Sequence, residues 1–370
     1  MKLNIFKNVD YSLLALIGII LLFGLVVLSS ASGPMGYQKF GDSYHYVKHQ
    51  LVYGLLPGIF LLLVCLKINY SFWRKRALIL LGASLFLLLL VFIPGIGTEY
   101  GTARSWISIG GLTFQPSELL KLTFLFYLAA WLEARGERKM QDMNSGLMPF
   151  LISLGIVMLL LILQPDIGTM SVIVAMAIIV YFLAGAPWSH IGALGAGGFA
   201  LFFILIKAAP YRTARFMTFL HPELDPQGIG YHINQALLAI GSGGILGLGL
   251  GHSRQKFQYL PEVAGDSIFA VVAEELGLII SVLVVAAFIF LLIKGFKIGS
   301  QAKDAFGRYL AVGIVSWLVV QALVNIGSMV GIMPMTGVPL PFISYGGSAL
   351  AVSLAGIGIL LNIDKVSKGR

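Results

Sequence analysis

One carboxylate stands at the edge of a long apolar run, and two more lie inside it. The run begins Asp266-Ser-Ile-Phe-Ala-Val-Val-Ala-Glu274-Glu275 and stays mostly apolar to about residue 293. In a helix that rises 1.5 Å per residue, Glu274 and Glu275 would lie roughly 12 to 14 Å beyond Asp266. Asp266 could therefore be a simple N-cap, or a general base at the mouth of a membrane helix. The two deeper carboxylates need a polar interior or a partner, and they would also suit a proton-coupled transporter.

Acidic and basic side chains also meet at the start of an earlier apolar segment. Pro116 suits the first turn of a helix, where the acidic Glu118 complements the unpaired N–H groups. Glu118 and Lys121 are three residues apart and share a helix face, so an ion pair is the plainest interpretation. Lys121 nevertheless lies inside an apolar segment, where an ionisable group is costly and indicates function. The functional alternative is that Arg104, Glu118 and Lys121 surround an anionic headgroup, and Ser117 is a further candidate for binding substrate.

Two other segments place polar side chains near apolar runs. Asp166, in Gln164-Pro-Asp-Ile-Gly168, favours an N-cap over a substrate-binding role. Residues 231–240 have apolar side chains at positions i, i+3, i+4 and i+7, which predicts an amphipathic helix in the headgroup plane. The polar side of that helix would present His232 and Gln235.

A polar stretch follows, Ser253-Arg-Gln-Lys-Phe-Gln-Tyr-Leu-Pro-Glu262. Its cations, Arg254 and Lys256, are of the type that binds a pyrophosphate, and Glu262 adds a further polar candidate. The alternative interpretation is an ordinary solvated loop.

These side chains belong to a chain whose composition is that of a membrane protein. Of its 370 residues, 58% are hydrophobic and 11% charged, and the mean hydropathy is +0.91. Soluble domains carry roughly a quarter charged residues. The apolar residues gather in runs of about 17 to 25, the length of a membrane-spanning helix, and lack the alternation of a β-barrel.

The sequence thus predicts an all-α polytopic membrane protein, forming one domain over 1–370 with about ten transmembrane helices. The predicted spans are 11–31, 47–66, 77–93, 117–132, 147–163, 168–185, 189–207, 266–293, 308–331 and 343–363. A single long loop, 208–265, lies between the seventh and eighth spans.

The distribution of positive charge orients these spans. Cytoplasmic loops retain Lys and Arg, and alternate connections on one side hold 16 of the 25 Lys and Arg residues. They are Lys2, Lys7, Lys67, Arg74, Lys75, Arg76, Arg135, Arg138, Lys139, Lys294, Lys297, Lys303, Arg308, Lys365, Lys368 and Arg370. We therefore expect both termini in the cytoplasm and the 208–265 loop outside, facing away from the cytoplasm.

Several other kinds of site are excluded or unsupported by sequence. The Gly-rich stretch 241–251 lacks the Lys-Ser/Thr of a nucleotide-binding P-loop. The chain has no His-Glu-x-x-His motif and a single cysteine, Cys65, so neither a dedicated zinc site nor an intrachain disulfide is expected. No basic stretch interleaves with aromatic residues, so no nucleic-acid partner is predicted.

Ten short motifs, in order along nearly the whole chain, resemble the SEDS (shape, elongation, division and sporulation) family, which includes FtsW and RodA. They are Asp10-Tyr-Ser-Leu-Leu with Ser30-Ala-Ser, Arg104-Ser-Trp-Ile, Phe114-Gln-Pro-Ser-Glu, Gln164-Pro-Asp-Ile-Gly, Gly230-Tyr-His-Ile, Ala239-Ile-Gly-Ser-Gly-Gly, Leu260-Pro-Glu, Asp266-Ser-Ile-Phe-Ala, Glu274-Glu-Leu-Gly and Pro339-Leu-Pro-Phe-Ile-Ser-Tyr-Gly-Gly-Ser348. Ser253-Arg-Gln-Lys-Phe and Ile343-Ser-Tyr-Gly-Gly favour the division branch, which is FtsW-like, over the RodA-like elongation branch. One departure is Val263-Ala-Gly-Asp-Ser, where many members have a His-Thr-Asp-Phe-like run.

The resemblance implies a peptidoglycan glycosyltransferase in the bacterial cytoplasmic membrane. Such an enzyme joins two lipid II molecules on the outer face, and the essential carboxylate of the family falls on Asp266. The resemblance also implies a class B penicillin-binding protein as partner. A divalent cation, Mg²⁺ or Mn²⁺, is the one cofactor considered, and its ligands are unknown. Two alternatives remain: a lipid II flippase or other transporter, and a non-catalytic scaffold for cell division.

Overall fold

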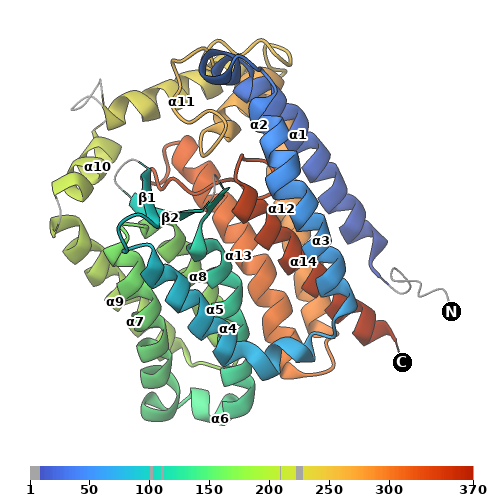
Figure 1. The fold of residues 1–370 in the computed structure, drawn as a ribbon. Coiled ribbons are helices and arrows are strands. Elements are labelled where there is room, and N and C mark those ends of the chain that lie inside the picture. The colour runs from blue at the N-terminus through green and yellow to red at the C-terminus, as the bar shows by residue number, and fades with distance from the viewer. Residues whose placement is uncertain (1–8, 101–102, 110–111, 209, 222–227, 370) are drawn as a thin grey trace.

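The computed structural model describes residues 9–100, 103–109, 112–208, 210–221 and 228–369 (Figure 1). Long helices run roughly side by side and form most of the molecule. In chain order, the helices of this bundle are α1 (Tyr11–Phe40), α2 (His45–Gln50), the π-helix η1 (Leu51–Leu55), α3 (Leu56–Lys67), α4 (Ser71–Leu90), α5 (Pro116–Arg135), α6 (Glu137–Met140), the π-helix η2 (Met143–Leu147), α7 (Met148–Leu163), α8 (Ile167–Leu183), α9 (Trp188–Lys207), α12 (Ile268–Ser300), α13 (Ala305–Met329) and α14 (Gly347–Lys368). Each of the predicted spans overlaps at least one of these helices, and the 47–66 span overlaps three, α2, η1 and α3.

The helical membrane fold predicted from hydropathy is confirmed, while the number of crossings stays a prediction. Seven helices in the described residues are long and apolar enough to cross a bilayer, and α8 is apolar but shorter. The central helices are α13 and α14, whose most apolar windows are 78% and 83% buried within the protein. The corresponding window of α9 is 6% buried, so α9 lies at the edge of the bundle.

One connection departs from the all-α prediction. The segment between α4 and α5 forms a three-stranded antiparallel sheet in the order β1 (Gly97–Tyr100), β2 (Ala103–Ile109), β3 (Leu112–Phe114). Within β2, Trp106, Ile107 and Ile109 are of the aromatic and β-branched types that favour strands. Ser105 and Ile107 are buried whereas Trp106 and Ser108 are half-buried, which is the two-residue period of a strand. The segment is short and lies between two long apolar runs, so the prediction of membrane spans missed it.

The long loop between α9 and α12 is also more structured than predicted. It contains α10 (Pro210–Leu220) and α11 (Ile229–Gly243), which together arch over one end of the bundle (Figure 1). The predicted amphipathic helix, 231–240, lies within α11. Its buried face consists of Ile233, Ala236 and Ala239, whereas Leu237 is exposed. This helix packs against α12, so protein as well as solvent surrounds it.

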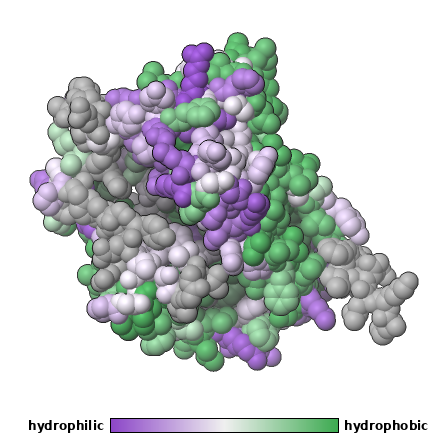
Figure 2. All heavy atoms as spheres, turned by 45° about the horizontal axis from the view of Figure 1, so that its top comes forward, coloured by the Kyte–Doolittle hydropathy of each residue, from purple (hydrophilic) through white to green (hydrophobic). Residues whose placement is uncertain are grey.

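The two kinds of surface on the protein fit a membrane position. Seen with the loop end turned forward, hydrophilic residues gather over that end, and one flank is mainly hydrophobic (Figure 2). Many apolar side chains on the helices are exposed, such as Leu22 at 68% and Leu78 at 71%. Lipid is the solvent in which such exposure costs little.

Helix α12 is broken at Gly277, where φ is 75° and ψ is −175°. The Gly-rich loop lies in the break, because Leu248 N–H donates to Glu274 O at 3.0 Å and Leu278 N–H donates to Gly244 O at 3.0 Å. The loop thereby satisfies backbone groups that a continuous helix would pair internally. The Asp266 end of α12 and the Gly-rich loop are thus hydrogen-bonded into one unit.

Gly277→Ala should destabilise the fold strongly. A Cβ at this position would lie 2.3 Å from Gly247 N and 2.5 Å from Ile245 O, which are backbone atoms that cannot rotate away. The left-handed φ alone costs an alanine about 1–3 kcal/mol. Thermal unfolding of the purified protein in detergent measures the effect. Gly82→Ala, in α4 with open space around its Cβ, is the matched control; equal unfolding temperatures for the two variants would contradict the prediction.

Candidate functional site

Asp266 lies in a turn at the loop end of the bundle, directly before α12. The N-cap of α12 is Ser267, so Asp266 precedes the cap position by one residue. The Asp266 side chain is half-buried. Its position at the end of a helix, beneath the hydrophilic loops, suits a carboxylate that accepts a proton from a substrate.

His232 of α11 contacts this turn. Ser267 Oγ donates a hydrogen bond to Pro261 O at 2.7 Å, so in its 2.6 Å contact with His232 the hydroxyl oxygen accepts a hydrogen bond from Nε2–H. Gln235 lies one helical turn further along α11 and is half-buried. The predicted polar side of α11 therefore contacts the Asp266 turn through His232.

Glu118 and Lys121 form the predicted ion pair, and it is deeply buried. The Lys121 Nζ to Glu118 Oε1 distance is 2.8 Å, and the two side chains are 0% and 1% exposed. Lys121 also donates to Gln321 Oε1 at 2.7 Å, and Gln321 Nε2 donates to Pro339 O at 2.9 Å. The pair is thus connected, through α13, to the segment that precedes α14. Charges this far from water depend on such partners.

The capping role predicted for Asp166 is confirmed. Asp166 is the N-cap of α8 and accepts from Thr169 N–H at 3.0 Å. Its other carboxylate oxygen accepts from Ser117 Oγ at 3.1 Å and from Gln115 Nε2 at 3.4 Å. Ser117 and Asp166 therefore join the starts of α5 and α8.

Glu274 and Glu275 are held by the loop that contains the predicted cations. Lys256 Nζ lies 2.7 Å from Glu275 Oε1, with side-chain exposures of 4% and 1%. Glu274 accepts from Ser253 Oγ at 2.5 Å and from Arg254 N–H at 2.9 Å. Both carboxylates consequently have strong local donors, as buried charges require.

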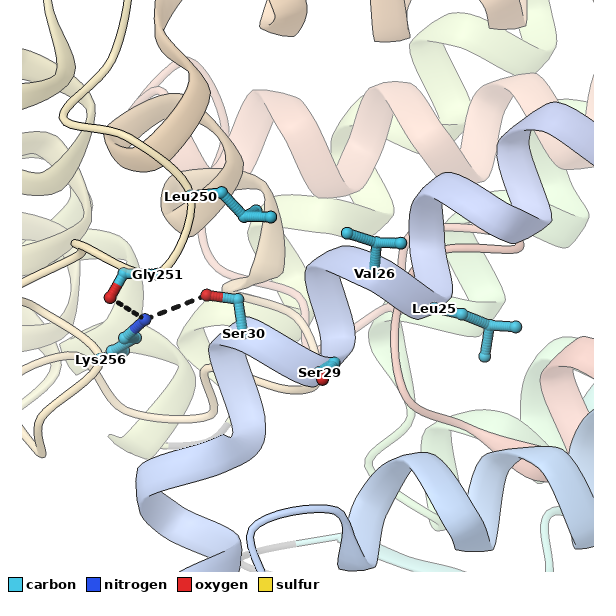
Figure 3. A pocket seen from close by; sticks show the side chains of 7 residues that line it. All are labelled: Leu25, Val26, Ser29, Ser30, Leu250, Gly251 and Lys256. Atoms are coloured by element: carbon cyan, nitrogen blue, oxygen red, sulfur yellow. Dashed lines mark hydrogen bonds between the residues drawn. The ribbon is translucent and has the colours of Figure 1, made fainter.

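The ammonium of Lys256 has no hydrogen left for a phosphate. Besides Glu275, it donates to Ser30 Oγ at 3.0 Å and to Gly251 O at 2.8 Å (Figure 3). A lysine has three N–H donors, and these contacts use all of them. Together Lys256, Ser30 and Leu250 line part of an open pocket of about 480 Å³ beside α1.

The remaining candidates lie at the surface or in the sheet. Arg254 and Glu262 are exposed on the loop. Arg104 lies in β2, but its side chain falls outside the described residues. Of the cations proposed to bind an anion, Arg254 is the one whose described side chain is exposed, since Lys121 and Lys256 are ion-paired.

Among the described residues, no group of three or more His, Cys, Asp or Glu side chains is arranged to hold a metal ion. A Mg²⁺ or Mn²⁺ ion can also be held by one or two carboxylates together with substrate phosphates, so the divalent cation stays a prediction.

Sequence reasoning missed several buried polar side chains near the site. Asn325 and Gln321 of α13, Ser344 before α14 and Gln50 of α2 are each at most 4% exposed and make hydrogen bonds between separate segments. Polar residues within apolar spans are a usable signal, since they are costly in a membrane without a partner.

The fold and site define a multi-pass membrane protein with a carboxylate under structured loops at one end of its bundle. The family model described as "Cell cycle protein", of FtsW, RodA and SpoVE, matches residues 11–369. The chain belongs to this family.

Relatives and solved structures agree with this assignment. Stage V sporulation protein E of Bacillus subtilis is 41% identical over 360 residues, covering 96% of this chain and 97% of the relative. The probable peptidoglycan glycosyltransferase FtsW of Geobacter sulfurreducens is 41% identical over 369 residues, covering 99% and 98%.

A chain from a peptidoglycan synthase complex, studied for its coordination of polymerization and crosslinking, is 30% identical with a TM-score of 0.80, covering 98% of this chain and 99% of that one. The rod shape determining protein RodA of Thermus thermophilus is also 30% identical, with a TM-score of 0.72 and 98% coverage of both chains. The FtsW-like character predicted from sequence is confirmed.

Proposed function

We propose that this chain is a peptidoglycan glycosyltransferase that polymerises lipid II on the outer face of the bacterial cytoplasmic membrane. The observation that carries the proposal is the position of Asp266 at the loop end of the bundle, in a family whose named relatives include such transferases. The start of α1 and the end of α14 lie toward the other end of the bundle (Figure 1). The charge distribution predicts most Lys and Arg residues on that side, which supports cytoplasmic termini.

The reaction is a single displacement. Asp266 takes the proton of the acceptor GlcNAc 4-hydroxyl, whose oxygen forms a bond with the anomeric carbon of the donor MurNAc. The bond from that carbon to the phosphate oxygen breaks, and undecaprenyl diphosphate leaves with the electron pair. Attack from the opposite face converts the α donor into a β-linked product. One carboxylate suffices, because the leaving diphosphate is stabilised by charge and needs no proton.

Arg254 is the exposed candidate cation that would attract the diphosphate. A Mg²⁺ or Mn²⁺ ion, if used, would arrive on the diphosphate itself, since phosphate oxygens are its preferred ligands. A class B penicillin-binding protein would crosslink the new strands, and the similarity to a chain from a peptidoglycan synthase complex supports such a partner.

The transporter alternative rests on Glu274 and Glu275. These carboxylates accept hydrogen bonds from Ser253 Oγ, Arg254 N–H and Lys256 Nζ, which supports a role in holding the loop against α12. Purified protein mixed with lipid II, with and without a class B penicillin-binding protein, separates the proposals. A polymerase gives glycan strands that gel electrophoresis resolves, a flippase moves lipid II between leaflets without product, and a scaffold does neither.

A further inference from the structure

The backbone of the Asp266 turn is held from one side by three consecutive hydrogen bonds. The carbonyl oxygens of residues 264, 265 and 266 each accept one bond. Tyr345 N–H donates to Ala264 O at 2.8 Å, and Ser344 Oγ donates to Gly265 O at 2.6 Å. Asn325 Nδ2 donates to Asp266 O at 2.8 Å. All three donors belong to α13 or to the segment before α14, far from the turn in sequence.

Asn325 and Ser344 are also held by hydrogen bonds to the segment 338–344, on the side away from the Asp266 turn. The second N–H of Asn325 donates to Val338 O at 2.8 Å, and Ser344 Oγ accepts from Leu340 N–H at 2.8 Å. The two side chains are 0% and 4% exposed. Asn325 Oδ1 makes no hydrogen bond within the described residues, so the amide is oriented by its two donated bonds alone. The segment 338–344 is in this way bonded to the Asp266 turn through two side chains.

The position of a side chain depends on the position of the backbone that carries it. A general base must lie within hydrogen-bond reach of the proton it takes, and a misplacement of about 1 Å can cost on the order of 10²-fold in rate. Short turns between helices fluctuate unless their polar groups are bound. We propose that Asn325 and Ser344 are positioning residues, which hold the Asp266 turn, and through it the carboxylate, against the acceptor hydroxyl. The inference rests on the proposed function of Asp266.

Steady-state kinetics of lipid II polymerisation by the full-length protein tests this role. Asn325→Ala and Ser344→Ala should each lower kcat about 10- to 100-fold, in line with a carboxylate displaced by up to about 1 Å. KM should stay close to that of the wild type, because neither side chain is exposed to bind substrate. Ser344→Thr keeps the hydroxyl and should recover most of the rate.

Ser328→Ala is the matched control. Ser328 is a buried residue of the same helix, and in the described part of the chain its hydroxyl bonds to the Asn325 carbonyl of α13 alone. Its removal should leave kcat unchanged. The inference is overturned if the Asn325 and Ser344 variants keep the kcat of the control, or if KM rises while kcat holds. Should Asn325→Ala not fold, the Ser344→Ala and Ser344→Thr pair decides. A wild-type protein that makes no polymer refutes the proposed function instead.

Discussion

Replacing Asp266 with Asn should abolish polymerisation of lipid II while leaving the protein folded. Asparagine has nearly the same size and can make the same hydrogen bonds through its carbonyl, but it does not accept a proton from a hydroxyl. General base catalysis contributes about 10²- to 10⁴-fold to a rate, so the polymerisation rate of the variant should be lower than that of the wild type by at least about 10²-fold. A quantitative glycan assay on purified variants measures the loss.

Asp42→Asn is the control for this substitution. Asp42 follows α1 and forms an exposed ion pair with Lys48, with side-chain exposures of 35% and 66%. The Asp42→Asn substitution removes one carboxylate that lies outside the helical bundle and makes no contact with the Asp266 turn. Activity of the Asp266→Asn variant equal to that of the Asp42→Asn variant would remove Asp266 from the mechanism.

Lys256→Met should be among the most destabilising single substitutions in the loop. It leaves Glu275, which is 1% exposed, as a buried charge whose remaining donors are neutral. Removing one partner of a buried ion pair typically costs about 3–5 kcal/mol. Lys256→Met combined with Glu275→Gln removes both charges and should regain most of the loss. Thermal unfolding in detergent compares the three proteins.

Lys48→Met provides the surface counterpart, since exposed ion pairs contribute about 0–1 kcal/mol. A Lys256→Met protein as stable as Lys48→Met would contradict the buried pair. The double variant also separates structure from substrate binding. If it is folded and polymerises lipid II at the normal rate, Lys256 stabilises the loop; a folded but inactive double variant would return Lys256 to the substrate site.

Features set by local sequence were predictable. The helices follow from the length of the apolar runs, and the Asp166 cap and the Glu118–Lys121 pair follow from spacings of three residues. The turn position of Asp266 was also accessible, because the apolar run begins directly after it. Each of these features depends on residues that are neighbours in the chain.

Features made by distant segments were not predictable in the same way. Lys256 was expected to bind an anion, but α12 supplies Glu275 and α1 supplies Ser30, which lies 226 residues away. The bonds from Asn325 and Ser344 to the Asp266 turn span 59 and 79 residues. Hydropathy shows that such polar groups need partners, but helix packing decides which partners they find.

The most direct test of the account supplies lipid II to one leaflet of sealed proteoliposomes. Protein orientation can be scored in a Cys65→Ser background by labelling Lys48→Cys with a membrane-impermeant maleimide, since the Lys48 side chain is 66% exposed in α2 at the loop end. We predict glycan strands only from molecules whose residue 48 faces the leaflet that holds lipid II. Polymer formed equally by both orientations, or by none, would contradict a catalytic carboxylate at the loop end.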